Sequence, residues 1–323
     1  MRAWRALRRR ILTPDVRQTE PEVRGFHGKT PASRDRLATV GRSFLAGYAV
    51  AAEARQAPDA EPHLERIPTG FRGFAYEGAA MAFAMRDGLS VRRGRHVADF
   101  LAGRGDRHVY MAYVGVGWAM ARLPRPRWTR LHAPDPLLRW LVLDGYGFHQ
   151  AYFHTDTYVH RRHRDERFRW PPDASPDYAP RVIDQGIGRA SWFVAGTDPR
   201  ELVRIFDRFP AHRRADLYAG AGLAATYAGG AAEDELEWLR AAAGAHRAEL
   251  AQGAAFAAGA RVRAGLVVPH NETATRVFCG TSVDAAARAT DEARIGLPDD
   301  GDLPAFEIWR RRISDAFVGA VRS

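Results

Sequence analysis

The chain has 323 residues, of which 48 are Lys or Arg and 38 are Asp or Glu, so its formal net charge is +10. A hydrophobic share of 46% and a charged share of 27% exclude a disordered chain, and the length permits a sizeable core. The single cysteine excludes an internal disulfide framework and a cysteine-cluster metal site. The basic excess suits nucleic acid, an anionic membrane or an acidic partner.

Residues 1–60 are predicted to form a basic helical cap. Within residues 1–12, apolar side chains share one helical face and five arginines cover the rest. Such a helix either lies on anionic lipid or serves as an ordinary capping helix. No stretch is long and apolar enough to cross a bilayer, and no signal peptide is visible. We therefore expect a cytoplasmic protein, peripheral to the inner face of the membrane if this helix docks there.

Six segments that share a pair of small residues then follow one another along the chain. Their first glycines are separated by 37, 30, 41, 34 and 33 residues. Two positions after each first glycine stands Gly or Ala, followed by a larger side chain. We predict a glycine-rich helix at each segment, over residues 76–86, 109–122, 141–153, 184–194, 217–228 and 248–261. The first glycines are Gly78, Gly115, Gly145, Gly186, Gly220 and Gly253.

A period near 35 residues is the size of a helix hairpin in a repeat protein. Glycine inside a helix costs about 0.5–1 kcal/mol relative to alanine, and close approach of neighbouring helices would offset that cost. The predicted fold is all-α. We expect a right-handed, α-solenoid-like stack of about six degenerate helix hairpins of TPR-like size over residues 61–303. Residues 304–323 are predicted to form a C-terminal capping helix.

Comparing the repeats with one another identifies residues that break the pattern. His149 stands where the five other segments have alanine, and Arg189 stands where the others have an apolar side chain. A buried arginine is costly unless it is paired. The residue before the first glycine is polar in four segments, and these side chains are expected to edge a shared groove. The four polar residues are Glu77, Asp144, Gln185 and Gln252, and Trp118 and Phe148 are expected to contribute apolar walls.

His149 also begins the densest histidine stretch of the chain. His149, His154 and Asp156 are candidate metal ligands by residue type, but their spacing matches no standard metal motif. A substrate-contacting histidine and a structural histidine remain open alternatives. The sequence leaves the cofactor unknown. The scattered arginines, without a helix-turn-helix or zinc-finger pattern, argue against nucleic-acid binding.

Several longer runs resemble the UnbL group of enediyne biosynthesis proteins, which are basic, histidine-containing and of unknown function. The runs are RGFAYEGAAMAFAM, HVYMAYVGVGWAMARLP, LLRWLVLDGYGFHQAYFHTD, RADLYAGAGLAATYAGG and RAGLVVPHNETATRVFCG. Members of that group are encoded beside an iterative polyketide synthase and a membrane protein. The resemblance implies a role in maturing a linear polyene or polyyne polyketide into the enediyne core. It supplies no catalytic residue.

Together, the repeat and the resemblance predict an accessory protein that holds a polyene or polyyne intermediate in an apolar helical groove. His149, Tyr152 and Arg189 are the candidates for acid–base or orienting chemistry there. The alternative is a non-catalytic scaffold or carrier whose basic surface docks the polyketide synthase or the membrane partner. Whether the protein is an enzyme stays open at this point.

Overall fold

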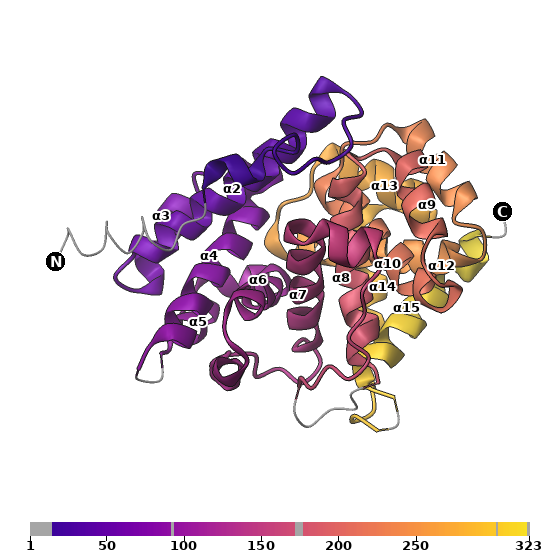
Figure 1. The fold of residues 1–323 in the computed structure, drawn as a ribbon. Helices are drawn as coiled ribbons and strands as arrows, with labels where there is room; N and C mark the ends of the chain where they lie inside the picture. The colour runs from indigo at the N-terminus through magenta and orange to yellow at the C-terminus, as the bar shows by residue number, and fades with distance from the viewer. Residues whose placement is uncertain (1–14, 92–93, 172–176, 302, 322–323) are drawn as a thin grey trace.

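In a computed structural model, residues 15–91, 94–171, 177–301 and 303–321 are described, and they contain helices and no β-strand (Figure 1). The predicted all-α class is confirmed. Seven helices of this part of the chain, here called the row helices, pack one on the next in chain order. The row helices are α2 (Pro31–Glu53), α4 (Thr69–Leu89), α6 (Val109–Arg122), α7 (Trp140–Phe153), α8 (Ala179–Val194), α10 (Ala211–Ala228) and α12 (Arg247–Ala264).

The remaining helices lie between or after the row helices. Each of the six ranges expected to be glycine-rich helices lies within one row helix, from α4 to α12. The helix α15 lies within residues 304–323, and it packs against α12. The other helices are α3 (Glu61–Leu64), α5 (His96–Leu101), α9 (Pro199–Asp207), α11 (Glu233–Ala242), α13 (Pro269–Cys279), α14 (Val283–Glu292) and α15 (Ala305–Val321).

Glycine allows the row helices to approach to backbone contact. A Cβ atom on Gly145 would lie 2.0 Å from the carbonyl oxygen of Val114, and one on Gly186 would lie 2.0 Å from that of Asp144. No side chain fits at such a distance. The propensity lost by placing glycine inside a helix is therefore offset by direct backbone packing.

These contacts recur in one register along the row. The first glycine of each segment faces the carbonyl oxygen of the residue just before the first glycine of the preceding segment. Equivalent positions in successive row helices therefore face the same side of the row. The contacts are Gly115 with Glu77, Gly145 with Val114, Gly186 with Asp144, Gly220 with Gln185, and Gly253 with Ala219.

The helix α2 follows the same register, although it falls in the segment expected to be a cap. A Cβ on Gly47 would lie 1.9 Å from the carbonyl oxygen of Ala75, and one on Gly78 would lie 2.0 Å from that of Phe44. Leu45 occupies the place of the first glycine in α2, so the small-residue pair is incomplete there. That substitution explains why the sequence comparison did not reveal this helix as an equivalent of the others.

The start of the row lies against its end. The Nζ atom of Lys29 donates to Glu235 at 2.7 Å and to the carbonyl oxygen of Gly230 at 3.0 Å. Arg261 of α12 donates to the carbonyl oxygen of Gly70 at the start of α4, at 3.1 Å. In Figure 1 the segment before α2 lies beside the part of the molecule that holds α11 and α13. The row helices therefore wrap around an interior space.

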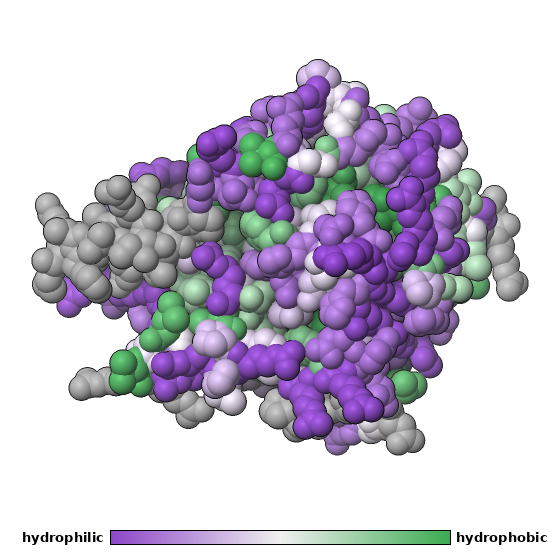
Figure 2. Space-filling model, viewed as in Figure 1, coloured by the Kyte–Doolittle hydropathy of each residue, from purple (hydrophilic) through white to green (hydrophobic). Residues whose placement is uncertain are grey.

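The expected lipid-facing helix at residues 1–12 lies outside the described residues. Within the described part of the chain, no helix has the length and apolar character needed to cross a membrane. The face shown in Figure 2 is largely hydrophilic, with apolar side chains scattered among polar ones.

Candidate functional site

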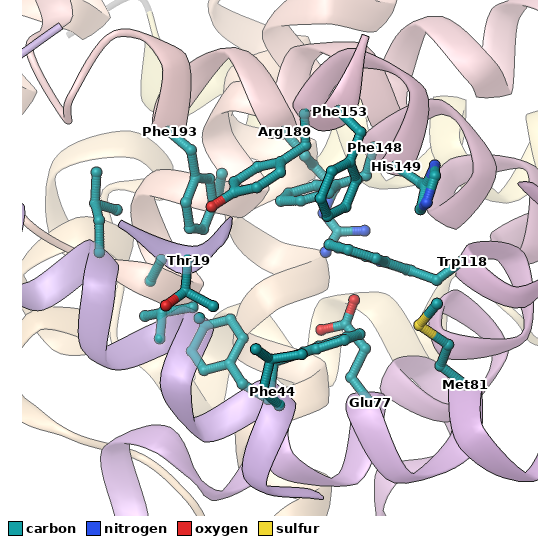
Figure 3. A pocket seen from close by; sticks show the side chains of 18 of the residues that line it. Thr19, Phe44, Glu77, Met81, Trp118, Phe148, His149, Phe153, Arg189 and Phe193 are labelled. Atoms are coloured by element: carbon teal, nitrogen blue, oxygen red, sulfur yellow. The ribbon is translucent and has the colours of Figure 1, made fainter. Parts of the chain in front are cut away.

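The row helices surround a partly open cavity of about 510 Å³, within the usual range for small-molecule sites. Side chains from α2, α4, α6, α7, α8 and α10 line it, together with the short 3₁₀ helix Val16–Thr19 that precedes α2. Most of the wall is apolar and much of it is aromatic (Figure 3). Representative wall residues are Phe44, Phe74, Met81, Trp118, Phe148 and Phe193.

One position of the repeat supplies a wall residue from every row helix from α4 to α12. It is the third residue after the first glycine, the position at which Arg189 departs from the pattern. Because the register is constant, this position always faces the interior. Met81, Trp118, Phe148, Arg189 and Leu223 line the large cavity, and Phe256 lines a neighbouring cavity of about 40 Å³ that shares Arg189, Leu223 and Tyr227 with the first.

The structure brings most of the predicted site residues together. Asp144 lines the smaller cavity, and Gln185 is buried beside it. Gln252 does not join this group, because it lines neither cavity and accepts a hydrogen bond from Arg310 at 3.3 Å. The predicted residues that line the large cavity are Glu77, Trp118, Phe148, His149, Tyr152, His154 and Arg189.

Arg189 is buried and paired. Its guanidinium forms an ion pair with Asp144 of α7, which is fully buried, and it lies 5.1 Å from the ring centroid of Phe148. Gln185 donates to the other oxygen of Asp144 at 2.7 Å. Leaving either charge unpaired in this place would be strongly destabilising. The odd arginine of the repeat is thus held by a carboxylate from the preceding row helix.

Glu77 is buried like Arg189 and Asp144, but it takes no part in their ion pair. Its side chain points into the cavity toward the guanidinium of Arg189 (Figure 3), yet no cation of the described residues lies within 4 Å of its carboxyl group. Burial, with the neighbouring charge of Asp144, raises the pKa of Glu77 to about 7, against the opposing effects of Arg189 and Trp118. Near neutral pH, Glu77 therefore exists in both its protonated and its ionised form.

His149 is buried among aromatic rings. Its ring centroid lies 5.6 Å from that of Trp118 and 4.7 Å from that of Phe153. Burial lowers the pKa of His149 to about 3, and its buried Nδ1 atom has no hydrogen-bond partner among the described residues. At neutral pH the imidazole is uncharged. Burial also raises the pKa of the neighbouring Tyr152, so its phenol stays protonated.

The candidate metal ligands do not form a ligand set. His154 and Asp156 are exposed, and Asp156 pairs with Arg161 at 2.9 Å. The ring centroids of His149 and His154 are 6.4 Å apart. Among the described residues, no group of three or more His, Cys, Asp or Glu side chains is arranged to hold a metal ion.

Phe44 and Tyr227 are among the wall residues that sequence reasoning missed. Phe44 comes from α2, which was assigned to the cap. Tyr227 comes from the end of α10, and its buried hydroxyl has no hydrogen-bond partner in the described structure. A Cβ on Gly73 would lie 1.9 Å from that hydroxyl, so α4 and α10 also meet at a glycine. Gly73 lies outside the small-residue pair, and the repeat therefore gave no signal for this contact.

Comparison with known proteins gives one match. The curated proteins gave no match, and neither did the solved structures. One family model matches residues 3–317, which is nearly the whole chain and includes every residue of the cavity wall. The chain therefore belongs to the DUF1702 family, which is described as a family of proteins of unknown function.

Proposed function

We propose that this protein is an accessory protein of enediyne biosynthesis that binds a linear polyene or polyyne polyketide chain in the large cavity. The observation that carries the proposal is a deep, partly open cavity of about 510 Å³ whose wall is mainly apolar and rich in aromatic side chains. Flat aromatic faces suit a flat conjugated chain. The depth of the cavity would also limit the contact of a reactive chain with water and with other chains while it is matured.

We also propose that the row is a degenerate, right-handed α-solenoid. The recurring glycine contacts support this proposal, because each row helix meets the next through equivalent residues. The helix α2 would then be a further unit in addition to the six that the sequence suggested. In this interpretation, the cavity is the concave face of the solenoid, closed where the row returns on itself.

A second candidate function is that of a carrier that delivers the chain without changing it and docks the synthase or a membrane partner. Arg122 favours this candidate, since it is exposed, lines the cavity and has no acidic partner within 4 Å among the described residues. An acidic surface of a partner would find an available cation there. Residues 1–12, which lie outside the described part of the chain, would provide a second docking segment for the same partner.

Binding is tested with cis-parinaric acid, a conjugated tetraene whose fluorescence rises in apolar surroundings. We expect saturable binding with one site per chain. Leu223→Trp should weaken it at least tenfold, because the larger ring fills the cavity. Leu303→Trp is the matched control, as Leu303 is exposed and lines neither cavity. Absence of saturable binding, or equal binding by the two variants, would overturn the proposal.

A second experiment separates conversion from carriage. The polyketide synthase is run with and without this protein, and the released chain is analysed by absorption and mass spectrometry. A changed chain supports a role in chemistry. A chain that is unchanged but bound to the protein supports the carrier.

A further inference from the structure

One carboxyl group of the described residues lines the large cavity, and its position indicates chemistry as well as binding. Resting on the function proposed above, we propose that Glu77 transfers a proton to and from the bound conjugated chain, so that the protein catalyses migration of its double bonds. Among the described residues, Glu77 is the only Asp or Glu in the wall of the large cavity. It is 3% exposed, and it points into the space that the chain would occupy (Figure 3).

The neighbours of Glu77 leave its carboxyl group available. From α8 and α7 it faces Arg189 and Asp144, and these two are paired with each other. Tyr227 of α10 is also a neighbour of Glu77. Burial, together with the negative charge of ionised Glu77, raises the pKa of the Tyr227 phenol and keeps it protonated. Trp118 of α6 and Phe44 of α2 complete the surroundings without adding a charge. Because Asp144 forms the ion pair with Arg189, no cation in the described part of the chain pairs with Glu77 and holds it as a permanent carboxylate.

The pKa of about 7 supports this role, since a group that both gives and takes a proton works best near the ambient pH. His149 is poorly suited to it. With a pKa near 3, its imidazole does not hold a proton at neutral pH. One carboxyl group therefore serves as both donor and acceptor, and His149 is left as an uncharged part of the wall.

The reaction balances without a co-reactant. The protonated carboxyl of Glu77 adds its proton to one carbon of the conjugated chain, and the electron pair of a double bond forms the new C–H bond. The resulting allylic cation is spread along the chain, and the ring faces of Trp118 and Phe148 stabilise it. The Glu77 carboxylate then removes a proton from another carbon, whose C–H electron pair becomes a double bond. Glu77 is restored, and no atom is gained or lost.

The test is deuterium incorporation into cis-parinaric acid incubated with the protein in D₂O, followed by mass spectrometry. We expect incorporation, together with a change in the absorption spectrum as double bonds move. Glu77→Gln keeps the shape of the side chain and removes the acid. It should slow incorporation by about 100-fold or more while leaving binding within about threefold.

The control variant is Glu237→Gln, at an exposed glutamate of α11, which should incorporate deuterium at the wild-type rate. A fast Glu77→Gln variant would overturn the inference. So would a wild-type protein that binds the probe and incorporates no deuterium, and that result would leave the proposed binding function intact. If the probe does not bind at all, the proposed function itself fails. Near-ultraviolet circular dichroism of Glu77→Gln verifies that its loss of exchange is not a loss of folding.

Discussion

Glu77 and Glu307 are equally buried, at 3% exposure each, yet their pKa values move in opposite directions. Burial acts to raise both. For Glu307 on α15, the charges of Arg310 and Arg181 outweigh it and hold the pKa below its ordinary value. Arg181 lies 2.9 Å from the Glu307 carboxylate, and the Tyr178 hydroxyl donates to it, also at 2.9 Å. For Glu77, burial prevails, and its pKa rises to about 7.

The difference shows that the supply of cations, rather than depth, decides what a buried acid can do. Around Glu307 and Asp216, three arginines serve two carboxylates. At the cavity, Arg189 faces the carboxyl groups of both Glu77 and Asp144, and it forms its ion pair with Asp144. The first cluster fixes α15 against α8 and α10. The second leaves one acid without a fixed partner, and four predictions test this difference.

The largest expected effect is at the fully paired site. Glu307→Gln should lower the free energy of unfolding by about 3–5 kcal/mol at pH 7, because it leaves three arginines with Asp216 as their one carboxylate in a largely buried cluster. Since the pKa of Glu307 is lowered in the fold, its contribution is lost as the pH falls, so the deficit should shrink in acid. Urea unfolding at several pH values measures it, with the exposed Glu292→Gln as the control. A loss below about 1 kcal/mol would contradict the comparison.

Glu77→Gln should instead raise the free energy of unfolding above neutral pH. The folded pKa of about 7 exceeds the ordinary 4.5, so the wild type loses stability as the pH rises through 7. The variant carries no such charge. It should match the wild type near pH 4 and exceed it by about 3 kcal/mol at pH 8. Thermal or urea unfolding across this range measures the difference, and a pH-independent difference would exclude a raised pKa at Glu77.

Asp144→Asn tests whether Asp144 keeps Arg189 away from Glu77. Without the Asp144 charge, Arg189 should pair with Glu77 and lower the pKa of that carboxyl by about one unit or more. NMR of the labelled glutamate carboxyl reads the midpoint directly. Because Glu77 takes over as partner, the stability lost should be about 1–2 kcal/mol, less than at Glu307. The exposed Asp156→Asn should leave the midpoint unchanged.

The smallest effect is expected for His149→Ala. The ring packs on Trp118 and Phe153 beside an existing cavity, so its removal should cost about 1 kcal/mol at pH 8. Because the pKa of His149 is lowered in the fold, the wild type loses stability as the pH falls below 6.5. The variant should therefore equal or exceed the wild type near pH 5. A loss of deuterium exchange as large as that of Glu77→Gln would instead assign the proton transfer to His149.

The sequence predicted the helical class. Several residues that it singled out line the cavity, because one glycine register places the same positions at the same side of every row helix. Arg189, Trp118 and Glu77 were all selected by that comparison, and all three line the cavity. The pairing of Arg189 with Asp144 could not be predicted, since a repeat pattern says which face a residue occupies and not which partner it finds across 45 positions.

The other omissions have equally local causes. Leu45 replaces the first glycine of α2, so Phe44 was not recognised as part of the wall. The return of the row on itself depends on single long side chains, such as Lys29 and Arg261, that reach carbonyl oxygens far along the chain. Such contacts leave no periodic trace in a sequence. Gln252 satisfied the repeat rule, yet it faces Arg310 because α15 covers α12 there.

The glycine register also bears on how such a protein can change over evolution. The contacts that hold the row helices together use backbone atoms and small residues. The side chain of the third residue after the first glycine takes no part in those contacts. A substitution at Met81, Trp118, Phe148, Leu223 or Phe256 would alter what the interior accepts and leave the helix-to-helix contacts as they are. Relatives that share the glycines could thus diverge in their ligands through a handful of independent exchanges, one for each helix, without a new fold.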